Sequence, residues 1–230
     1  MPNWVKTIVK SKPDVIKDIM NKYTENNVFS FNKVIPMPKD LDIESGSRGE
    51  EGMMLLYLES TNDIYKLKIN EAYKELNVFN TDIYREKRFG EIEERLDEYK
   101  KSDDYEKCIE LGKKYIENFQ KYGHCTWYNW CCENWGTKWD ISRSPHNEDT
   151  IMFQTAWGFA GDIILELSKN YPSAVFKCEF ADEGIKENSG IVEIKNGEVF
   201  KEKYDLSEYK INKIWDAYIP EPEEELEMEI

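Results

Sequence analysis

The chain has 230 residues, of which 13% are aromatic, enough to build a hydrophobic core and to exclude an intrinsically disordered protein. No apolar run approaches the roughly 18 residues of a membrane span, so a membrane protein is excluded as well. The net charge of −15, with 46 acidic against 31 basic residues, argues against general binding of phosphate backbones. We expect no signal peptide, and therefore a cytoplasmic protein with reduced thiols.

The first 60 residues predict a strand, a helix and a second extended segment. Residues 4–10 mix β-branched and basic side chains, as short strands do. Pro13 then opens a helix, since proline is favoured in a first helical turn and apolar residues follow it at spacings of three and four. Residues 28–35 predict the second extended segment. The short apolar run 53–58 fits a strand or a helix equally well.

Residues 61–122 have a different pattern, in which charges of both signs alternate with apolar residues spaced three or four apart. We interpret this segment as two or three solvent-exposed helices. Glu93, Glu94, Asp103 and Asp104 lie within it, and we expect them to form exposed acidic faces that bind a partner.

The chain beyond residue 122 returns to strand patterns after a tryptophan-rich stretch. Four of the seven tryptophans lie in residues 127–139. Residues 150–157 and 174–180 predict strands, with a helix between them over 158–170. Asn196-Gly197 predicts the turn of a β-hairpin, because both residues tolerate the left-handed backbone that such turns require.

Two strand–helix–strand units in this order predict an α+β domain with a ferredoxin-like, split βαβ antiparallel sheet. The domain would comprise residues 1–60 and 123–218, with a helical insertion at 61–122. Residues 219–230 contain six glutamates that repel one another, and they predict a flexible acidic tail. This tail adds three candidate binding residues, Glu223, Glu224 and Glu225.

Four motifs occur in the order in which a known family carries them: Met1-Pro-Asn-Trp4, Phe31-Asn-Lys-Val-Ile-Pro-Met-Pro38, Trp135-Gly-Thr-Lys-Trp-Asp140 and Phe153-Gln-Thr-Ala-Trp157. In these motifs the chain resembles the Api-ninety-two-like (Api92-like) family of ferredoxin-like proteins from phages and plasmids. The resemblance implies a ferredoxin-like fold and an origin on a mobile genetic element. It implies no catalytic residues, because the function of the family is unknown.

The motif from Trp135 to Asp140 is the main candidate binding site. Lys138 and Asp140 are two residues apart and share one face if the segment is extended. The indole N–H groups of Trp135 and Trp139 need hydrogen-bond partners. Such a cluster can grip a peptide or a flipped base. The structural alternative is that the tryptophans of the motifs pack together in one core.

The sequence patterns do not indicate an enzyme. Phosphate-binding glycine loops and the G-x-S-x-G and H-E-x-x-H patterns are missing from the sequence. His124 lies near Cys125, Cys131 and Cys132, but the paired C-x-x-C spacing of zinc sites is missing. We therefore predict no catalytic residues, no cofactor and no bound metal, and expect the cysteines to pack as small apolar side chains.

Two binding functions remain open. In the first, the protein is a non-enzymatic, phage- or plasmid-encoded factor that binds a host or mobile-element protein with a basic surface. It would then inhibit a nucleic-acid-binding defence system, in the manner of an anti-CRISPR protein. In the second, it is an accessory protein of phage or plasmid replication that binds single-stranded nucleic acid through exposed aromatic residues flanked by lysine. The net charge favours the first, although solubility alone also explains the acidity.

Overall fold

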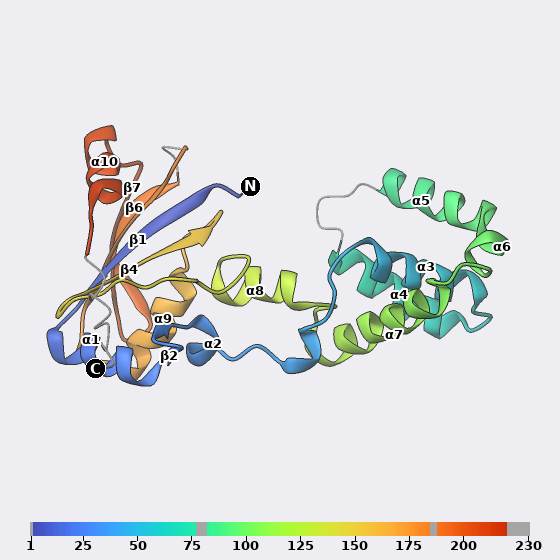
Figure 1. Ribbon diagram of the computed structural model, residues 1–230, viewed down its shortest axis with the longest axis horizontal. Helices are drawn as coiled ribbons and strands as arrows, with labels where there is room; N and C mark the ends of the chain where they lie inside the picture. Colours follow the sequence, from blue (N-terminus) through green and yellow to red (C-terminus); the bar gives the residue numbers. More distant parts are fainter. Residues whose placement is uncertain (1, 77–81, 185–187, 220–230) are drawn as a thin grey trace, which may run out of the picture. The chain divides into compact units, whose positions relative to one another are not determined.

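The structure, a computed structural model, describes residues 2–76, 82–184 and 188–219. The chain divides into two compact units (Figure 1). The sheet unit comprises Met1–Pro36 and Cys131–Ile230, and the helical unit comprises Met37–Trp130. Within the described residues, no helix has both the length and the apolar composition needed to cross a membrane.

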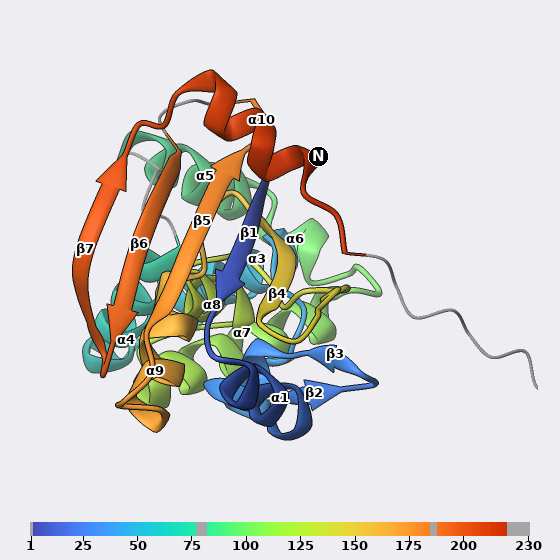
Figure 2. The ribbon, with the colours of Figure 1, turned by 90° about the vertical axis from the view of Figure 1, so that its left-hand side faces the viewer.

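The main sheet has five strands: β1 (Trp4–Lys10), β4 (Thr150–Ala156), β5 (Phe176–Asp182), β6 (Ser189–Lys195) and β7 (Glu198–Tyr204). They lie in the order β4-β1-β5-β6-β7, and every neighbouring pair is antiparallel (Figure 2). Because β4 and β5 both pair with β1, they run parallel to each other, and α9 (Gly161–Asn170) connects them. The result is a split βαβ unit with β1 between its two parallel strands.

Helices cover both faces of this sheet. Side chains alternate between the two faces along each strand, so each face presents its own set of side chains to the helices. α1 (Pro13–Lys22) contacts β4 and α9 contacts β6. On that face Phe159, just before α9, stacks on Phe180 with ring centroids 4.3 Å apart. α10 (Glu208–Asp216) contacts β1 and β5 on the opposite face, where Ile8, Ala181 and Ile214 share a buried apolar cluster.

Several predicted elements are confirmed. α1 begins at Pro13, as the sequence predicts. The strands predicted at 150–157 and 174–180 correspond to β4 and β5. The hairpin between β6 and β7 turns at Asn196 and Gly197, whose φ angles of 50° and 80° are those of the predicted left-handed pair.

The prediction of an extended segment over residues 28–35 is wrong. The segment contains one short strand, β3 (Val28–Phe29), which pairs with β2 (Thr24–Glu25) outside the main sheet. α2 (Phe31–Val34) follows, because the carboxylate of Asp140 accepts hydrogen bonds from the first backbone N–H groups of this helix. The first of the two predicted strand–helix–strand units therefore contributes only β1 to the main sheet, and the predicted split βαβ sheet is built on β1, β4 and β5.

The helical unit contains η1 (Lys39–Leu41), α3 (Ser47–Glu59), α4 (Asp63–Leu76), α5 (Asp82–Glu94), α6 (Leu96–Tyr99) and α7 (Tyr105–Tyr122). α3 and α7 approach backbone to backbone at Gly52 and Gly112. A Cβ atom on Gly52 would lie 1.8 Å from the carbonyl oxygen of Cys108, so only glycine fits there. The core of this unit includes Met53, Tyr73 and Tyr115, all at most 1% exposed.

The helical unit is larger than the predicted insertion at residues 61–122. The apolar run 53–58 is part of α3, which packs on α7. The side chain of Asn118 on α7 also donates to the carbonyl oxygens of Asp40 (2.9 Å) and Cys125 (3.1 Å), which ties the flanking segments to the helices. These contacts place the unit boundaries after residues 36 and 130; the second falls within α8 (Trp127–Trp135).

The C-terminal part also differs from its prediction. The sequence patterns gave no helix at α10, and Ile219, assigned to the tail, is 7% exposed and belongs to the apolar cluster under this helix. Residue 219 is therefore part of the folded unit. The rest of the predicted tail, including Glu223, Glu224 and Glu225, lies outside the described residues.

Candidate functional site

Within the motif from Trp135 to Asp140, some side chains are structural and others lie at the surface. Trp135 is 4% exposed, and its indole N–H donates to the carbonyl oxygen of Ile35 at 2.9 Å. The hydroxyl of Thr137 donates to the carbonyl oxygen of Ala156, also at 2.9 Å. These two residues thus anchor the segment after α8 to α2 and β4, and they leave little surface for a ligand.

Asp140 holds the start of α2 in place. Its Oδ2 accepts hydrogen bonds from the hydroxyl of Ser30 (2.7 Å) and the backbone N–H of Asn32 (3.2 Å). Its Oδ1 accepts from the backbone N–H groups of Phe31 (2.9 Å) and Ile141 (2.8 Å). Four donors therefore converge on one carboxylate, and its role is to cap a helix and fix a loop rather than to bind a ligand.

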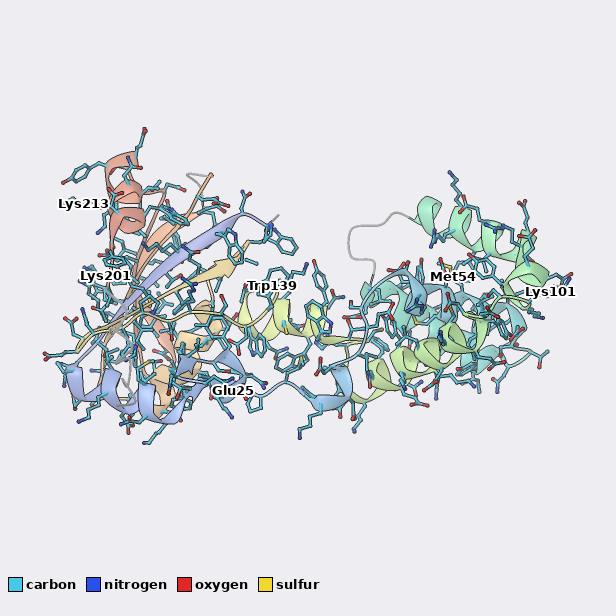
Figure 3. All side chains as sticks on the ribbon, in the orientation of Figure 1. Glu25, Met54, Lys101, Trp139, Lys201 and Lys213 are labelled. Atoms are coloured by element: carbon cyan, nitrogen blue, oxygen red, sulfur yellow. The ribbon has the colours of Figure 1, made fainter. Side chains whose placement is uncertain are left out.

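Lys138 and Trp139 lie at the surface instead, together with Trp157 from the end of β4. The Nζ of Lys138 lies 4.5 Å from the ring centroid of Trp139 and 5.0 Å from that of Trp157, so one ammonium group contacts two indoles. We call these three residues the Trp157 patch; Trp139 is labelled in Figure 3. Trp4 on β1 packs beside the patch, 6.4 Å from Trp139 between ring centroids.

Trp157 has a strained backbone and an exposed side chain. Its φ of 67° is left-handed, which is an outlier for so large a residue, and its side chain is 46% exposed. Its backbone N–H donates to the carbonyl oxygen of Asn3 (2.9 Å), and its carbonyl oxygen accepts from the Asn188 amide (3.0 Å). The next residue, Gly158, has no room for a Cβ atom, which would lie 2.4 Å from the Gly136 oxygen. The surroundings therefore fix the backbone that carries this indole.

A groove of about 690 Å³ lies beside the patch, over β1 and β4. We call it the Trp4 groove, and its lining residues are Trp4, Lys6, Ser142, Arg143, Pro145, Met152, Phe153, Gln154, Ala217, Tyr218 and Ile219. Two of these described residues are cations and two are exposed or half-exposed aromatics. None of them is acidic, although acidic residues outnumber basic ones in the chain.

Lys6 joins two walls of this groove. Its Nζ donates to the carbonyl oxygens of Trp215 (2.8 Å) and Ala217 (2.5 Å), and so caps the C-terminal end of α10. Burial lowers the pKa of Lys6, and the charge of Asp216 opposes this effect. A lysine ammonium has three N–H donors, so one remains after these two bonds.

The acidic candidates of the helical unit lie at helix ends. Glu93 and Glu94 are in the last turn of α5, and Asp103 and Asp104 are in the turn before α7; all four are exposed. Asp104 forms an ion pair with Lys107 at 3.5 Å. The structure assigns these carboxylates to the helical unit and the tryptophan motif to the sheet unit, so each unit carries its own candidates.

His124, Cys125 and Cys131 are packed as structural groups. Cys132 is exposed, so the expectation that the cysteines pack as small apolar side chains is wrong for this residue. Nδ1 of His124 lies 3.1 Å from a carboxylate oxygen of Glu75, and the thiol of Cys125 donates to the carbonyl oxygen of Ala72. Burial raises the pKa of Cys131 to about 12, which keeps this thiol protonated at neutral pH. Across the described residues, no three His, Cys, Asp or Glu side chains are grouped so that they could hold a metal ion.

Sequence reasoning did not select Trp157, Arg143 or Tyr218 as site residues. The signal for Trp157 was present, because a tryptophan directly before glycine at the end of a predicted strand often marks a turn. Arg143 and Tyr218 gave no such signal. They come to the groove from a loop and from the segment after α10, which are 75 residues apart in sequence.

The split βαβ sheet, its two helix-covered faces and the aromatic surface at one sheet edge define an α+β protein of the ferredoxin-like class. Residues 134–228 match the family model described as "Ferredoxin-like domain in Api92-like protein". This match confirms the resemblance predicted from the motifs, and it shows that these residues are similar to the ferredoxin-like domain of Api92-like proteins. The matched segment includes Trp139 and Trp157.

One solved structure adds to this comparison. The crystal structure of the protein Api92 from Yersinia pseudotuberculosis aligns over 90% of this chain and 99% of its own, with 9% sequence identity and a TM-score of 0.37. None of the curated proteins matches the chain.

Proposed function

We propose that the protein is a non-enzymatic, phage- or plasmid-encoded factor that acts in the host cytoplasm by docking onto another protein. The observation that supports this proposal is the Trp157 patch. The side chain of Trp157 is 46% exposed, and the Nζ of Lys138 lies 5.0 Å from the centroid of its ring. Exposed tryptophans on a fixed frame have the properties of the residues that contribute most to protein–protein interfaces.

The backbone of Trp157 adds to this argument. A left-handed φ costs a large side chain about 1–3 kcal/mol, and strained residues of this kind cluster at binding sites. The hydrogen bonds from Trp157 to Asn3 and from Asn188 to Trp157 fix its backbone, and the ammonium group of Lys138 lies against its indole. A side chain that is already ordered loses less conformational entropy on binding.

The exposed carboxylates of the helical unit indicate what charge the surface of the proposed partner carries. Glu93, Glu94 and Asp103 have no ion-pair partner among the side chains that the structure describes. Such carboxylates attract a basic surface and accelerate its association. We therefore propose that the partner carries a basic, nucleic-acid-binding surface, belongs to a host defence system and is inhibited by the complex.

Affinity capture from a bacterial lysate, followed by mass spectrometry, tests the docking surface. Wild type is compared with Trp157→Gly, which removes the indole at a position where glycine fits the backbone. Tyr209→Ala is the matched control, because Tyr209 is 69% exposed and lies under Lys213 at 4.9 Å on α10. We expect Trp157→Gly to weaken binding of the captured protein about 30-fold or more, and Tyr209→Ala to leave it unchanged.

A second pair of variants tests the role of charge. Glu93→Gln/Glu94→Gln/Asp103→Asn removes three carboxylates, and Asp63→Asn/Glu71→Gln/Glu117→Gln removes three exposed carboxylates elsewhere in the same unit. The first should slow association and reduce its dependence on salt more than the second does. The captured protein should also lose its nucleic-acid binding when the purified factor is added in equimolar amount. Equal capture by wild type and Trp157→Gly, or an unchanged activity of the captured protein, would refute the proposal.

A further inference from the structure

The Trp4 groove combines groups that suit a nucleotide. Trp4 and Tyr218 supply aromatic rings, and Tyr218 is 79% exposed. Lys6 and Arg143 supply positive charge, and Gln154 is exposed with an amide that both donates and accepts hydrogen bonds. Acidic side chains are missing from the described residues that line the groove.

We propose that the Trp4 groove binds a short segment of single-stranded nucleic acid. Bases would stack on Trp4 and Tyr218, and Arg143 would bind a phosphate, with the remaining Lys6 N–H as a further donor. Aromatic platforms beside cations are the usual means of binding single strands without sequence preference. The groove volume of about 690 Å³ is within the 300–1,000 Å³ of typical small-ligand sites, and so fits one or two nucleotides.

The acidic residues are unevenly distributed along the sequence. The helical unit contains 21 of the 46, and residues 220–230 contain six more and no basic residue. Residues 1–36 and 131–219 carry 19 acidic and 16 basic residues. At physiological salt, exposed charges are screened beyond about 8 Å. Within the described part of the sheet unit, the charges that line the groove are the cations Lys6 and Arg143.

An acidic peptide is the competing ligand for a groove with two cations. A peptide carboxylate would use Lys6 and Arg143 but would leave the two aromatic rings and the amide of Gln154 without a role. A nucleotide uses all of these groups, since it combines a phosphate with a flat base that both stacks and forms hydrogen bonds. The aromatic walls therefore favour the nucleic acid.

Fluorescence anisotropy of a 5′-labelled hexathymidylate, titrated with the full chain at 50 mM NaCl, tests the proposal. Arg143→Gln and Tyr218→Ala each change an exposed side chain of the groove, and a thermal melt of each variant checks that it is folded. The matched control is Lys213→Gln/Tyr209→Ala, an exposed lysine–aromatic pair on α10 outside the groove. We expect each groove variant to weaken binding at least fivefold, and the control to stay within twofold of wild type.

Three further measurements make the test decisive. Trp157→Gly should bind the hexathymidylate as wild type does, so a failure of protein docking and a failure of this site can be told apart. Hexaglutamate that displaces the oligonucleotide at equal concentration would overturn the proposal in favour of a peptide site. Displacement by inorganic phosphate alone at millimolar concentration would overturn the stacking role. No detectable binding at 1 mM protein, or equal binding by all variants, would also overturn it.

Discussion

In the helical unit, α3 and α7 touch backbone to backbone at Gly52 and Gly112, whereas in the sheet unit polar side chains such as Asp140 and Thr137 hold the connecting segments. Helices packed on one another expose mainly charged faces, so the helical unit offers carboxylates as its candidate contacts. Connections fixed by hydrogen bonds can hold a large apolar side chain at the surface. Trp157 in the sheet unit is such a side chain, since its backbone is hydrogen-bonded to Asn3 and Asn188.

The largest effect on stability is expected from a substitution at the close contact between Gly52 and Gly112 in the helical unit. Gly52→Ala places a Cβ atom 1.8 Å from the Cys108 oxygen, so the helices must separate. We expect the free energy of unfolding of this unit to fall by about 3 kcal/mol or more, measured by urea unfolding with circular dichroism at 222 nm.

Gly90→Ala on α5 is the matched control for this prediction. A Cβ atom there meets no atom within 4 Å, so the change should stabilise the helix by about 0.5–1 kcal/mol. If Gly52→Ala is as stable as wild type, the close approach of α3 and α7 is not what holds this unit together.

The second prediction tests whether the hydrogen bonds of Asp140 stabilise the sheet unit. Asp140→Ala removes an acceptor from four donors at the start of α2 and the following loop. We expect the free energy of unfolding to fall by about 2–3 kcal/mol, measured by tryptophan fluorescence during unfolding in urea. Asp140→Asn keeps part of this acceptor and should lose less. A loss below about 0.5 kcal/mol for Asp140→Ala would show that these bonds do not hold the segment.

The third prediction separates a binding tryptophan from a core tryptophan. Trp157→Gly relieves the left-handed strain while it removes a half-exposed side chain, so stability should change by less than about 1 kcal/mol. A core tryptophan replaced by a small residue costs about 3–5 kcal/mol. A loss of that size in differential scanning calorimetry would identify Trp157 as a packing residue.

The smallest effect on stability is expected from the ion pairs of Glu179, one of which joins α10 to the sheet. Burial raises the pKa of Glu179, but Lys210 (2.8 Å) and Lys177 (3.3 Å) outweigh this, and the pKa lies below its ordinary value. A carboxyl whose pKa is lowered on folding contributes stability above its unfolded pKa, and this contribution is lost as the pH falls through the folded pKa.

Glu179→Gln should therefore cost about 1 kcal/mol or less at pH 7. The difference from wild type should shrink as the pH falls below about 4.3, the unperturbed glutamate pKa, in urea unfolding at several pH values. Glu148→Gln, which changes an exposed carboxylate in the loop before β4, should show no such dependence. A difference between Glu179→Gln and wild type that stays constant with pH would contradict the ionic contribution.

Local signals predicted much of the fold. Pro13 marks the start of α1, and Asn196-Gly197 marks the hairpin turn, because each depends on backbone preferences of the residues themselves. The extended prediction for residues 28–35 failed for the opposite reason. The carboxylate that caps α2 belongs to Asp140, more than 100 residues later, and no local pattern includes it.

The sequence selected a candidate segment but did not separate its surface residues from its buried ones. The motif from Trp135 to Asp140 includes a buried indole at Trp135 and a partly buried one at Trp139. Which indole is buried depends on the carbonyl oxygen of Ile35 and on the packing of α2, and neither lies near the motif in sequence.

The sequence by itself determined the α+β class, the antiparallel hairpin and the family resemblance, because these follow from periodicity, turn residues and short motifs. Only the tertiary structure decided where the two units divide, which side chain of the motif caps α2, and that Trp157 stands at the surface beside Lys138. Those features arise from contacts between residues far apart in the chain, where hydrogen-bond satisfaction and close packing outweigh local preference.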